Sequence, residues 1–197
     1  MEKKPSFILA SKSPQRIRLL KQAGYTFGIR PCPYPEPSIE GEPRDGVLTV
    51  AGFKADQVAQ NLDASQEDLL VVGADTIVVL ENQSLGKPQS LDEAFAMISR
   101  LQGTVHSVLT GVAIASKKNG ILESWVEESL VEMDSLSDEE IWKYLRQKPT
   151  CEKAGAVDIE SIDFARVIKG SYSNVVGFPI ESFQEKFSTL EQRSSLL

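Results

Sequence analysis

Polar residues with the chemistry to bind phosphate stand near the start of the chain, at residues 11–16, which read Ser-Lys-Ser-Pro-Gln-Arg. The apolar residues 7–10 predict a short buried strand, and Ser13 followed by a proline predicts the start of a helix. Such a turn presents free backbone N–H groups and the positive end of the helix dipole, to which Ser11 and Arg16 add a hydroxyl and a cation. The turn suits a phosphate or a carboxylate. In a simpler interpretation, Ser13 only caps the helix and Arg16 lies on its solvated face.

Asp75 is a carboxylate inside a strongly apolar segment. Residues 69–80 predict one long central strand buried on both faces, because their apolar residues do not alternate with polar ones. A buried carboxylate is costly unless it is paired, bound to a metal or placed at a cleft, so the position favours a functional role. The alternative is that the strand ends at Gly73 and Asp75 is a turn residue. Lys54 on an expected helix and Lys87 in a tight turn suit phosphate contacts, but each also fits an ordinary exposed position.

The elements expected around these residues alternate between strands and helices, which is an α/β pattern. The prolines of residues 31–37 predict a loop or a sheet edge between the first two helices. Residues 90–93 and 137–140 have the spacing of capping boxes. Further helices are expected at 45–62, 91–101, 138–148 and after 179, and further strands at 108–115, 121–133 and 164–168. The chain is expected to be one domain over residues 1–197.

Charge is distributed unevenly along the chain. The 197 residues carry a formal net charge of −7 and are 41% hydrophobic, which is typical of a globular protein. An acidic balance argues against a general nucleic-acid or anionic-membrane binder. Residues 1–30, however, hold seven Lys and Arg against one Glu, or +6, so the remainder carries −13. The basic segment is therefore interpreted as one wall of an anion-binding cleft.

The cysteine and histidine counts exclude several classes of site. Cys32 and Cys151 are far apart, so neither a disulfide framework nor a thiolate zinc site is indicated, and a cytoplasmic location is expected. The single histidine, His106, cannot build a multi-histidine metal site. A Ser-His-Asp triad would have to use it, but no Gly-x-Ser-x-Gly motif accompanies it. Neither a signal peptide nor a membrane-spanning helix is expected.

Several ordered motifs resemble those of the Maf family of nucleotide pyrophosphatases. These are residues 8–16 (Ile-Leu-Ala-Ser-Lys-Ser-Pro-Gln-Arg), 72–76 (Val-Gly-Ala-Asp-Thr) and 85–88 (Leu-Gly-Lys-Pro), and residues 101–111, 153–156 and 170–179 continue the resemblance. The resemblance implies a mixed, twisted sheet flanked by helices, of the Maf and ITPase type, with two lobes around a nucleotide cleft. It also implies a divalent cation, Mg²⁺ or Mn²⁺, frequent homodimers, and hydrolysis of nucleoside triphosphates to monophosphate and pyrophosphate in a house-cleaning role.

The resemblance gives the phosphate-binding residues their roles. Arg16, Lys54 and Lys87 would neutralise the triphosphate. The Ser11 hydroxyl and the backbone near Ser13 would donate hydrogen bonds to it. These roles require the first turn, the second helix and the loop after the long strand to meet at one cleft.

Asp75 matches the catalytic aspartate of the family, and would orient or deprotonate the attacking water or hold the metal ion. Glu36 is expected to be the second acidic ligand of that metal. The proline-rich loop is not a clean match to the family pattern, so Glu40 and Glu42 are alternatives to Glu36.

Base specificity is where the chain departs from the family pattern. The family usually continues Tyr-Gly-Ile-Gln-Gly after the Lys-Ala-Gly-Ala motif, whereas residues 157–161 read Val-Asp-Ile-Glu-Ser. Thr76 resembles the dTTP/UTP branch, and Glu160 resembles the 7-methyl-GTP branch unless it points away from the base. An ionised glutamate only accepts hydrogen bonds, whereas glutamine both donates and accepts. We expect dTTP and UTP to be preferred, with 7-methyl-GTP as the alternative. Outside this class, a non-catalytic nucleotide-binding regulator of cell division or an interaction module without a ligand is the competing hypothesis.

Overall fold

A computed structural model describes residues 6–38, 41–147 and 154–194. Seven strands in these residues form one mixed sheet in the order β2-β1-β3-β5-β6-β7, with β4 pairing with β3 outside this path. Strand β1 is parallel to β2 and β3, and the other pairs are antiparallel. The strands are β1 (Phe7–Leu9), β2 (Phe27–Ile29), β3 (Val71–Leu80), β4 (Gln83–Leu85), β5 (Val105–Ser116), β6 (Gly120–Met133) and β7 (Ala165–Lys169).

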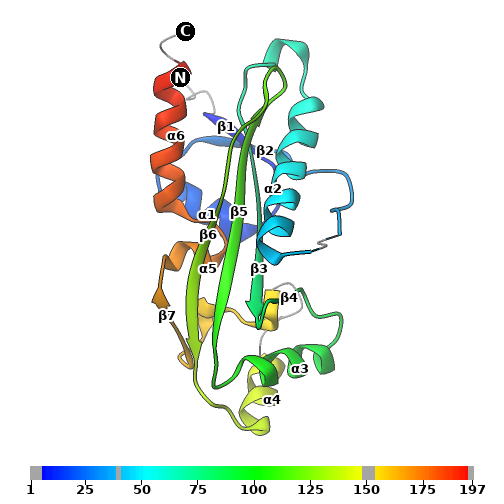
Figure 1. Cartoon of the computed structure of the whole chain (residues 1–197), viewed down its shortest axis with the longest axis vertical. Helices are drawn as coiled ribbons and strands as arrows, with labels where there is room; N and C mark the ends of the chain where they lie inside the picture. The colour runs from blue at the N-terminus through cyan, green and yellow to red at the C-terminus, as the bar shows by residue number, and fades with distance from the viewer. Residues whose placement is uncertain (1–5, 39–40, 148–153, 195–197) are drawn as a thin grey trace.

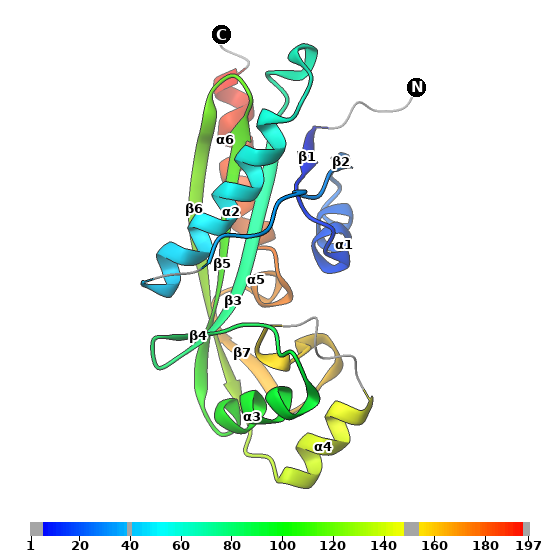
Figure 2. The ribbon, with the colours of Figure 1, turned by 90° about the vertical axis from the view of Figure 1, so that its right-hand side faces the viewer.

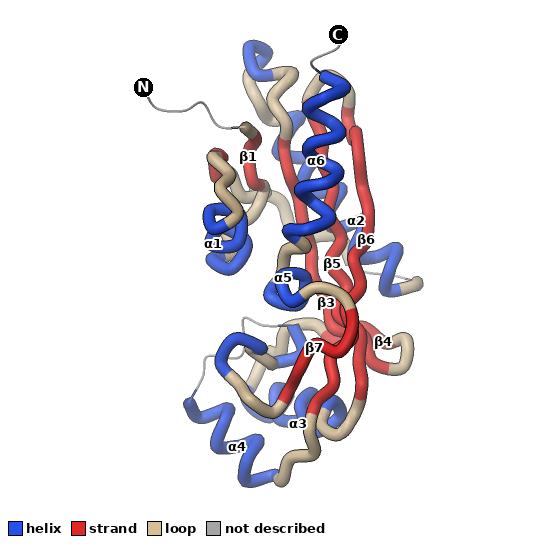
Figure 3. The backbone as a smooth tube through the Cα atoms, turned by 90° about the vertical axis from the view of Figure 1, so that its left-hand side faces the viewer, coloured by secondary structure: helices blue, strands red, loops and turns tan. Residues whose placement is uncertain are grey.

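Helices cover both faces of this sheet (Figures 1 to 3). The longest, α2, packs on the face to which Val71 and Ala113 belong, and α6 packs on the face of Val72 and Val112. The α-helices are α1 (Pro14–Gln22), α2 (Pro43–Gln60), α3 (Leu91–Leu101), α4 (Asp138–Gln147), α5 (Tyr172–Val176) and α6 (Ile180–Ser194). The expected mixed α/β fold is therefore confirmed. None of the helices in the described ranges is long and apolar enough to span a membrane.

Two lobes share the long strands β3, β5 and β6 (Figures 1 and 2). The first lobe contains β1, β2, α1, α2 and α6, and an aromatic cluster that includes Phe7, Phe183 and Phe187 fills its core. The second lobe contains β4, β7, α3 and α4, around a core that includes Ile98 and Met133. Because each lobe has its own core, a cleft can lie between them while the strands hold them together.

Helix α2 lies unusually close to the sheet. A Cβ atom added at Gly73 on β3 would lie 2.3 Å from the Ala51 carbonyl oxygen, and one at Gly111 on β5 would lie 2.6 Å from the Val47 carbonyl oxygen. Only glycine fits at both positions, because real Cβ contacts are not this short. This close packing brings the side chains of α2 to the middle of β3.

Local sequence patterns correctly predicted most helix starts. The Ser13 hydroxyl accepts a hydrogen bond from the Arg16 backbone N–H, and Pro14 is the first residue of α1. Ser90 caps α3 in the same way. Ser137 and Glu140 form a reciprocal capping box at the start of α4. Helix α2 begins two residues before the expected range.

The structure adds elements that the sequence reasoning missed and decides one alternative. Strands β2 and β4 have three residues each, and α5 has five. Residues 31–37 form no regular element, as expected. Strand β3 continues through Asp75 to Leu80, so the interpretation of Asp75 as a turn residue is wrong.

Candidate active site

The site lies at a gap in one edge of β3. On the side away from β5, strand β3 pairs with β1 at Val71 and Val72, and with β4 from Val78 to Leu80. Between these pairings, residues 73–77 have no strand beside them in the described part of the chain. A cavity of about 780 Å³ opens there, lined by the start of α1, by part of the proline-rich loop, by α2 and by the second lobe. Its volume is that of an ordinary small-molecule site.

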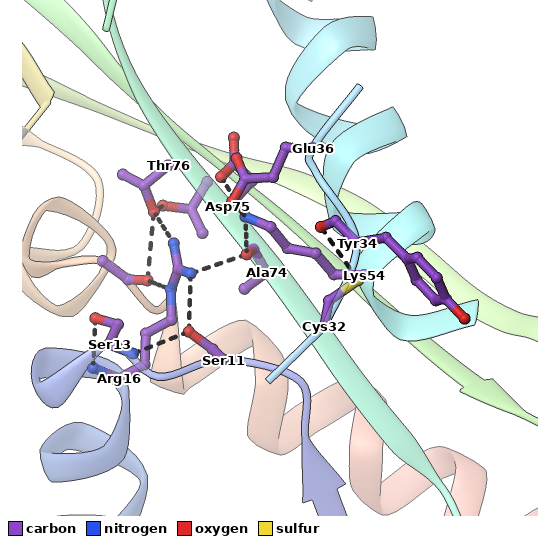
Figure 4. A network of polar contacts seen from close by, with 12 residues as sticks. Ser11, Ser13, Arg16, Cys32, Tyr34, Glu36, Lys54, Ala74, Asp75 and Thr76 are labelled. Carbon is purple, nitrogen blue, oxygen red and sulfur yellow. Dashed lines mark hydrogen bonds and ion pairs between the residues drawn. The ribbon is translucent and has the colours of Figure 1, made fainter. Parts of the chain in front are cut away.

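Two carboxylates share one buried ammonium group in this cavity (Figure 4). Lys54 Nζ on α2 lies 2.8 Å from Asp75 Oδ1 and 2.9 Å from Glu36 Oε1. Burial alone would raise the pKa of Glu36, but the hydrogen bond and charge of Lys54, helped by Lys87 and Arg16, lower it overall. Glu36 is therefore ionised at neutral pH. The sequence predicted these three residues, and the structure brings them together.

Arg16 is buried beneath the cavity and not on the solvated face of α1, so that simpler interpretation is wrong. Its Nε donates to the Gly177 carbonyl at 2.9 Å, and its Nη1 donates to the Ala74 carbonyl at 2.9 Å and to Ser11 Oγ at 3.3 Å. Its Nη2 donates to Thr76 Oγ1 at 3.1 Å. Four of its five N–H donors are thus directed at protein acceptors. Arg16 ties α1, β3 and the end of α5 together.

The pKa of Arg16 is lowered, chiefly by burial of its guanidinium group. The negative charges of Asp75 and Glu36 oppose this effect. A cation enclosed in this way gives the floor of the cavity a fixed positive charge.

Thr76 belongs to a polar network that reaches α6. Its hydroxyl lies 3.0 Å from that of Thr110, which donates to the Asn174 carbonyl at 3.2 Å. The Ser171 and Ser173 hydroxyls each donate to Glu181 at 2.7 Å. The motif at residues 170–179, which carried only a resemblance in the sequence, therefore positions Gly177 and Thr110 around Arg16 and Thr76.

The remaining phosphate-binding candidates also line the cavity, and they come from both lobes. Ser11, Lys12 and Ser13 lie at the turn into α1, and Lys87 lies in the loop after β4. Glu42 does not join them, because it precedes α2 and accepts a hydrogen bond from Asn82. Glu40 lies outside the described residues, as does Cys151.

Glu160 does not line this cavity. It lies in the short 3₁₀-helix η4 (Ile159–Ser161) and forms an ion pair with Arg18 of α1. It lines a second, shallow cavity together with Arg166 and Tyr172. The sequence left open whether Glu160 lies beside the base or points away from it, and could not show this pairing between residues 142 positions apart.

The wall of the cavity in the second lobe is mostly apolar, and it includes His106. This side chain is 6% exposed, its pKa is lowered to about 4 by burial, and its Nδ1 has no hydrogen-bond partner. It bonds to neither a Ser nor an Asp of the described residues, so the triad considered from the sequence is not formed. Sequence reasoning tested His106 only as a triad or metal residue and missed this position.

Asp75 and Glu36 have the carboxylate chemistry that a small divalent cation would need. Asp75 and Glu36 each use one carboxylate oxygen to contact Lys54, and Mg²⁺ commonly uses one or two carboxylates plus substrate phosphates and water. Among the described residues, no cluster of three or more His, Cys, Asp or Glu suits a metal ion. The chain would therefore contribute Asp75 and Glu36 as its two acidic ligands.

The fold and the site define a two-lobed α/β protein whose cleft combines cations, two acids and an apolar wall. The model of the Maf-like protein family matches residues 6–190, and the chain belongs to that family. A relative from Thermoanaerobacter sp. (strain X514), named dTTP/UTP pyrophosphatase, is 43% identical over 175 residues, or 88% of this chain and 90% of the relative.

Other relatives carry the same name. The dTTP/UTP pyrophosphatase of Pelotomaculum thermopropionicum (strain DSM 13744 / JCM 10971 / SI) is 41% identical over 176 residues, covering 88% of this chain and 90% of the relative. A solved structure of a nucleoside-triphosphatase / dITP/XTP pyrophosphatase from Mycobacterium abscessus matches with a TM-score of 0.41 and 12% identity, over 66% of this chain and 74% of that one. A likeness this weak carries no argument about function.

Proposed function

We propose that the chain is a nucleoside triphosphate pyrophosphatase that favours dTTP and UTP. The observation that carries this proposal is the cluster of Asp75, Lys54 and Glu36 at the unpaired edge of β3, inside a cavity large enough for a nucleotide. The names of the relatives and the threonine at position 76 support the choice of pyrimidine substrates. The products are the nucleoside monophosphate and pyrophosphate.

The triphosphate lies at the cationic end of the cavity. Lys12, Lys54 and Lys87 supply positive charge, and the turn at Ser13 supplies backbone N–H groups at the start of α1. Arg16 keeps this end in shape, since its hydrogen bonds fix Ser11 relative to β3. It retains one N–H on Nη2 for a phosphate oxygen.

Asp75 acts on the attacking water. The water oxygen attacks the α-phosphorus, its proton passes to the Asp75 carboxylate, and the bond from the α-phosphorus to the bridging oxygen breaks as pyrophosphate leaves. Lys54 holds Asp75 in place through a 2.8 Å contact, and the lysines stabilise the charge that develops on the leaving oxygens. The reaction thus needs a carboxylate and cations close together, and this end of the cavity contains both.

Asp75 and Glu36 would hold a divalent cation, Mg²⁺ or Mn²⁺. When bound, the cation supplies neutralisation of phosphate oxygens and activation of water. Omitting the metal and adding a chelator should abolish pyrophosphate release. Titration of each metal into the protein would show which one restores activity.

The decisive experiment compares pyrophosphate release by the purified chain and by Asp75→Asn, with UTP, dTTP, CTP, GTP and 7-methyl-GTP. We expect UTP and dTTP to be the best substrates, and Asp75→Asn to lose turnover by about a thousandfold or more. Asp68→Asn is the control, because Asp68 pairs with Lys118 on the surface. Undiminished release by Asp75→Asn would refute the proposed role of Asp75.

The same panel tests the competing functions. Glu160 was the reason for considering 7-methyl-GTP, and its pairing with Arg18 outside the cavity weakens that reason. Tight nucleotide binding without turnover would indicate a regulator, and the absence of any nucleotide-induced thermal shift would indicate an interaction module.

We also propose a house-cleaning role in the cytoplasm and assembly into homodimers. The role and the homodimer are carried over from the family to which the chain belongs, and the location from the two distant cysteines. Light scattering on the purified protein measures the assembly, and a monomer at micromolar concentration would contradict it.

A further inference from the structure

The cavity has two chemically different ends. Its first end carries the lysines, Asp75 and Glu36, and its second end is bounded by valines of β3, β5 and β6 and by residues after α4. Val78 pairs with Val108, and His106 pairs with Val131, across this part of the sheet. Alternation along β5 places His106 on the same face as Val108 and Thr110. The polar imidazole of His106 therefore lies within a mostly apolar wall of the cavity.

His106 is enclosed without the partners that a buried polar group needs. Its side chain is 6% exposed, and its Nδ1 is fully enclosed without a hydrogen bond. Buried polar groups normally have a partner, because a lost hydrogen bond in an apolar setting costs free energy. His106 lines the cavity, and because its Nδ1 is enclosed, Nε2 is the ring nitrogen that a ligand in the cavity could reach.

The imidazole ring of His106 is uncharged at neutral pH. Burial lowers the pKa of His106 to about 4, so the imidazole is neutral at pH 7. A neutral imidazole has one N–H donor and one bare nitrogen. Nδ1 has no hydrogen-bond partner, so the free protein does not select one tautomer of His106. A ligand that accepts a hydrogen bond from Nε2 would select the tautomer that is protonated at Nε2.

Other polar side chains near this end already have partners within the protein. Glu160 is paired with Arg18 and lies outside the cavity lining. The Thr76 hydroxyl accepts from Arg16 and contacts Thr110. Of these groups, His106 is the one whose hydrogen-bonding capacity is unused.

We propose that His106 is a specificity-determining residue that donates a hydrogen bond from Nε2 to a carbonyl of the nucleotide base. The proposal rests on the proposed function, since that function brings a nucleotide into the cavity. Uracil and thymine carry a carbonyl at C4, where cytosine carries an amino group. A donor at this position distinguishes UTP and dTTP from CTP, because the amino group of cytosine cannot accept it.

The first test uses the fact that the chain has a single histidine. In protein labelled with ¹⁵N-histidine, the imidazole nitrogen resonances belong to His106 without assignment by mutation. Saturating UMP or dTMP should move the Nε2 resonance, and CMP at equal saturation should move it much less. An unchanged resonance with bound UMP would overturn the proposal.

The second test separates base recognition from folding. His106→Leu should reduce the ratio of kcat/KM for UTP over that for CTP by about tenfold or more. His106→Gln should retain most of the ratio, because its amide nitrogen reaches the position of Nε2. Ile98→Val is the control, since Ile98 is buried in the core of the second lobe but does not line the cavity, and it should leave the ratio unchanged. A ratio unchanged in His106→Leu would overturn the proposal.

Calorimetric binding of UMP and CMP keeps the two proposals apart. A preference for UMP that depends on His106, without pyrophosphate release from UTP, would support the inference and refute the proposed function. Pyrophosphate release from UTP, together with equal binding of UMP and CMP, would support the proposed function and overturn the inference about His106. Failure of both monophosphates to bind would overturn the inference.

Discussion

Lys54 is the residue on which the two acids of the site depend. It is buried in α2 and contacts Asp75 and Glu36 at 2.8 and 2.9 Å, so removing its charge leaves two carboxylates close together without a shared cation. Like charges at this separation repel, and the phosphate loses a neutralising group at the same time. Lys54 therefore links the stability of the site to its chemistry.

Replacing Lys54 should impair catalysis more than replacing an exposed lysine that lies outside the cavity. We expect Lys54→Met to lower kcat/KM for UTP by about a hundredfold or more. Lys21→Met, on the exposed face of α1, is the control and should retain activity. Pyrophosphate release measures both. Equal activity of the two variants would contradict the assignment of Lys54.

His106 should make stability depend on pH. Its folded pKa of about 4 lies below the ordinary value of 6.5, so the unfolded chain binds a proton that the folded chain excludes. The stabilisation is present above pH 6.5 and is lost progressively as the pH falls toward 4, by up to roughly 3 kcal/mol. Urea unfolding of wild type and His106→Gln from pH 7 to pH 4 measures it. Identical pH slopes for the two proteins would contradict this origin.

The role of a residue could be predicted from the sequence only where its immediate neighbours along the chain made its side chain costly to bury. Asp75 was found because a carboxylate in an apolar strand needs a reason. The burial of Arg16 was not found, because its acceptors at Ala74 and Gly177 come from segments far along the chain. His106 was missed because an alternating strand gives no sign of which polar side chain lacks a partner.

At the scale of elements, the contact between α2 and the sheet positions Lys54 relative to Asp75. The helix approaches at Gly73 and Gly111, and Gly111 pairs directly with Asp75 across the sheet. The helix cannot move outward without also moving Lys54. The glycines are thus a condition for the 2.8 Å contact as well as for packing.

A methyl group at Gly73 should therefore disturb both packing and chemistry. Its Cβ would lie 2.3 Å from the Ala51 carbonyl oxygen, so Gly73→Ala should destabilise the protein by about 2 kcal/mol or more and reduce turnover. Gly52→Ala is the matched control, because nothing lies within 4 Å of that Cβ. In a helix interior this control should stabilise by about 0.5–1 kcal/mol. Urea denaturation would detect the opposite signs, and a stable Gly73→Ala would contradict the close approach.

Elements could be predicted where their own residues specify them. Ser13, Ser90 and Ser137 mark helix starts through bonds to neighbours three residues away. Strands β2 and β4 are too short to show a period, and they exist because β1 and β3 offer an edge. The gap between β1 and β4, which creates the cleft, was therefore not visible as a sequence pattern.

At the scale of the whole molecule, the lobes meet across the cleft as well as through the long strands. Arg18 belongs to α1 in the first lobe, and Glu160 belongs to η4, which packs beside the second lobe. Their hydrogen bond raises the pKa of Arg18, as the charge of Glu160 also does. The pair is partly exposed, with 45% of the Arg18 side chain and 27% of the Glu160 side chain accessible, so its contribution to stability should be below about 1 kcal/mol.

Disrupting this pair should change nucleotide affinity in the same proportion for every base. Glu160→Gln and Arg18→Ala each remove a contact between the lobes that lies outside the cavity lining, so KM should rise by a similar factor for UTP, CTP and GTP. High salt should reproduce part of the effect in wild type, because the pair is exposed to screening. Steady-state kinetics of the three substrates measure this. A change confined to one base would instead return Glu160 to the base-recognition role that the sequence suggested, because a contact between lobes has no means of distinguishing one base from another.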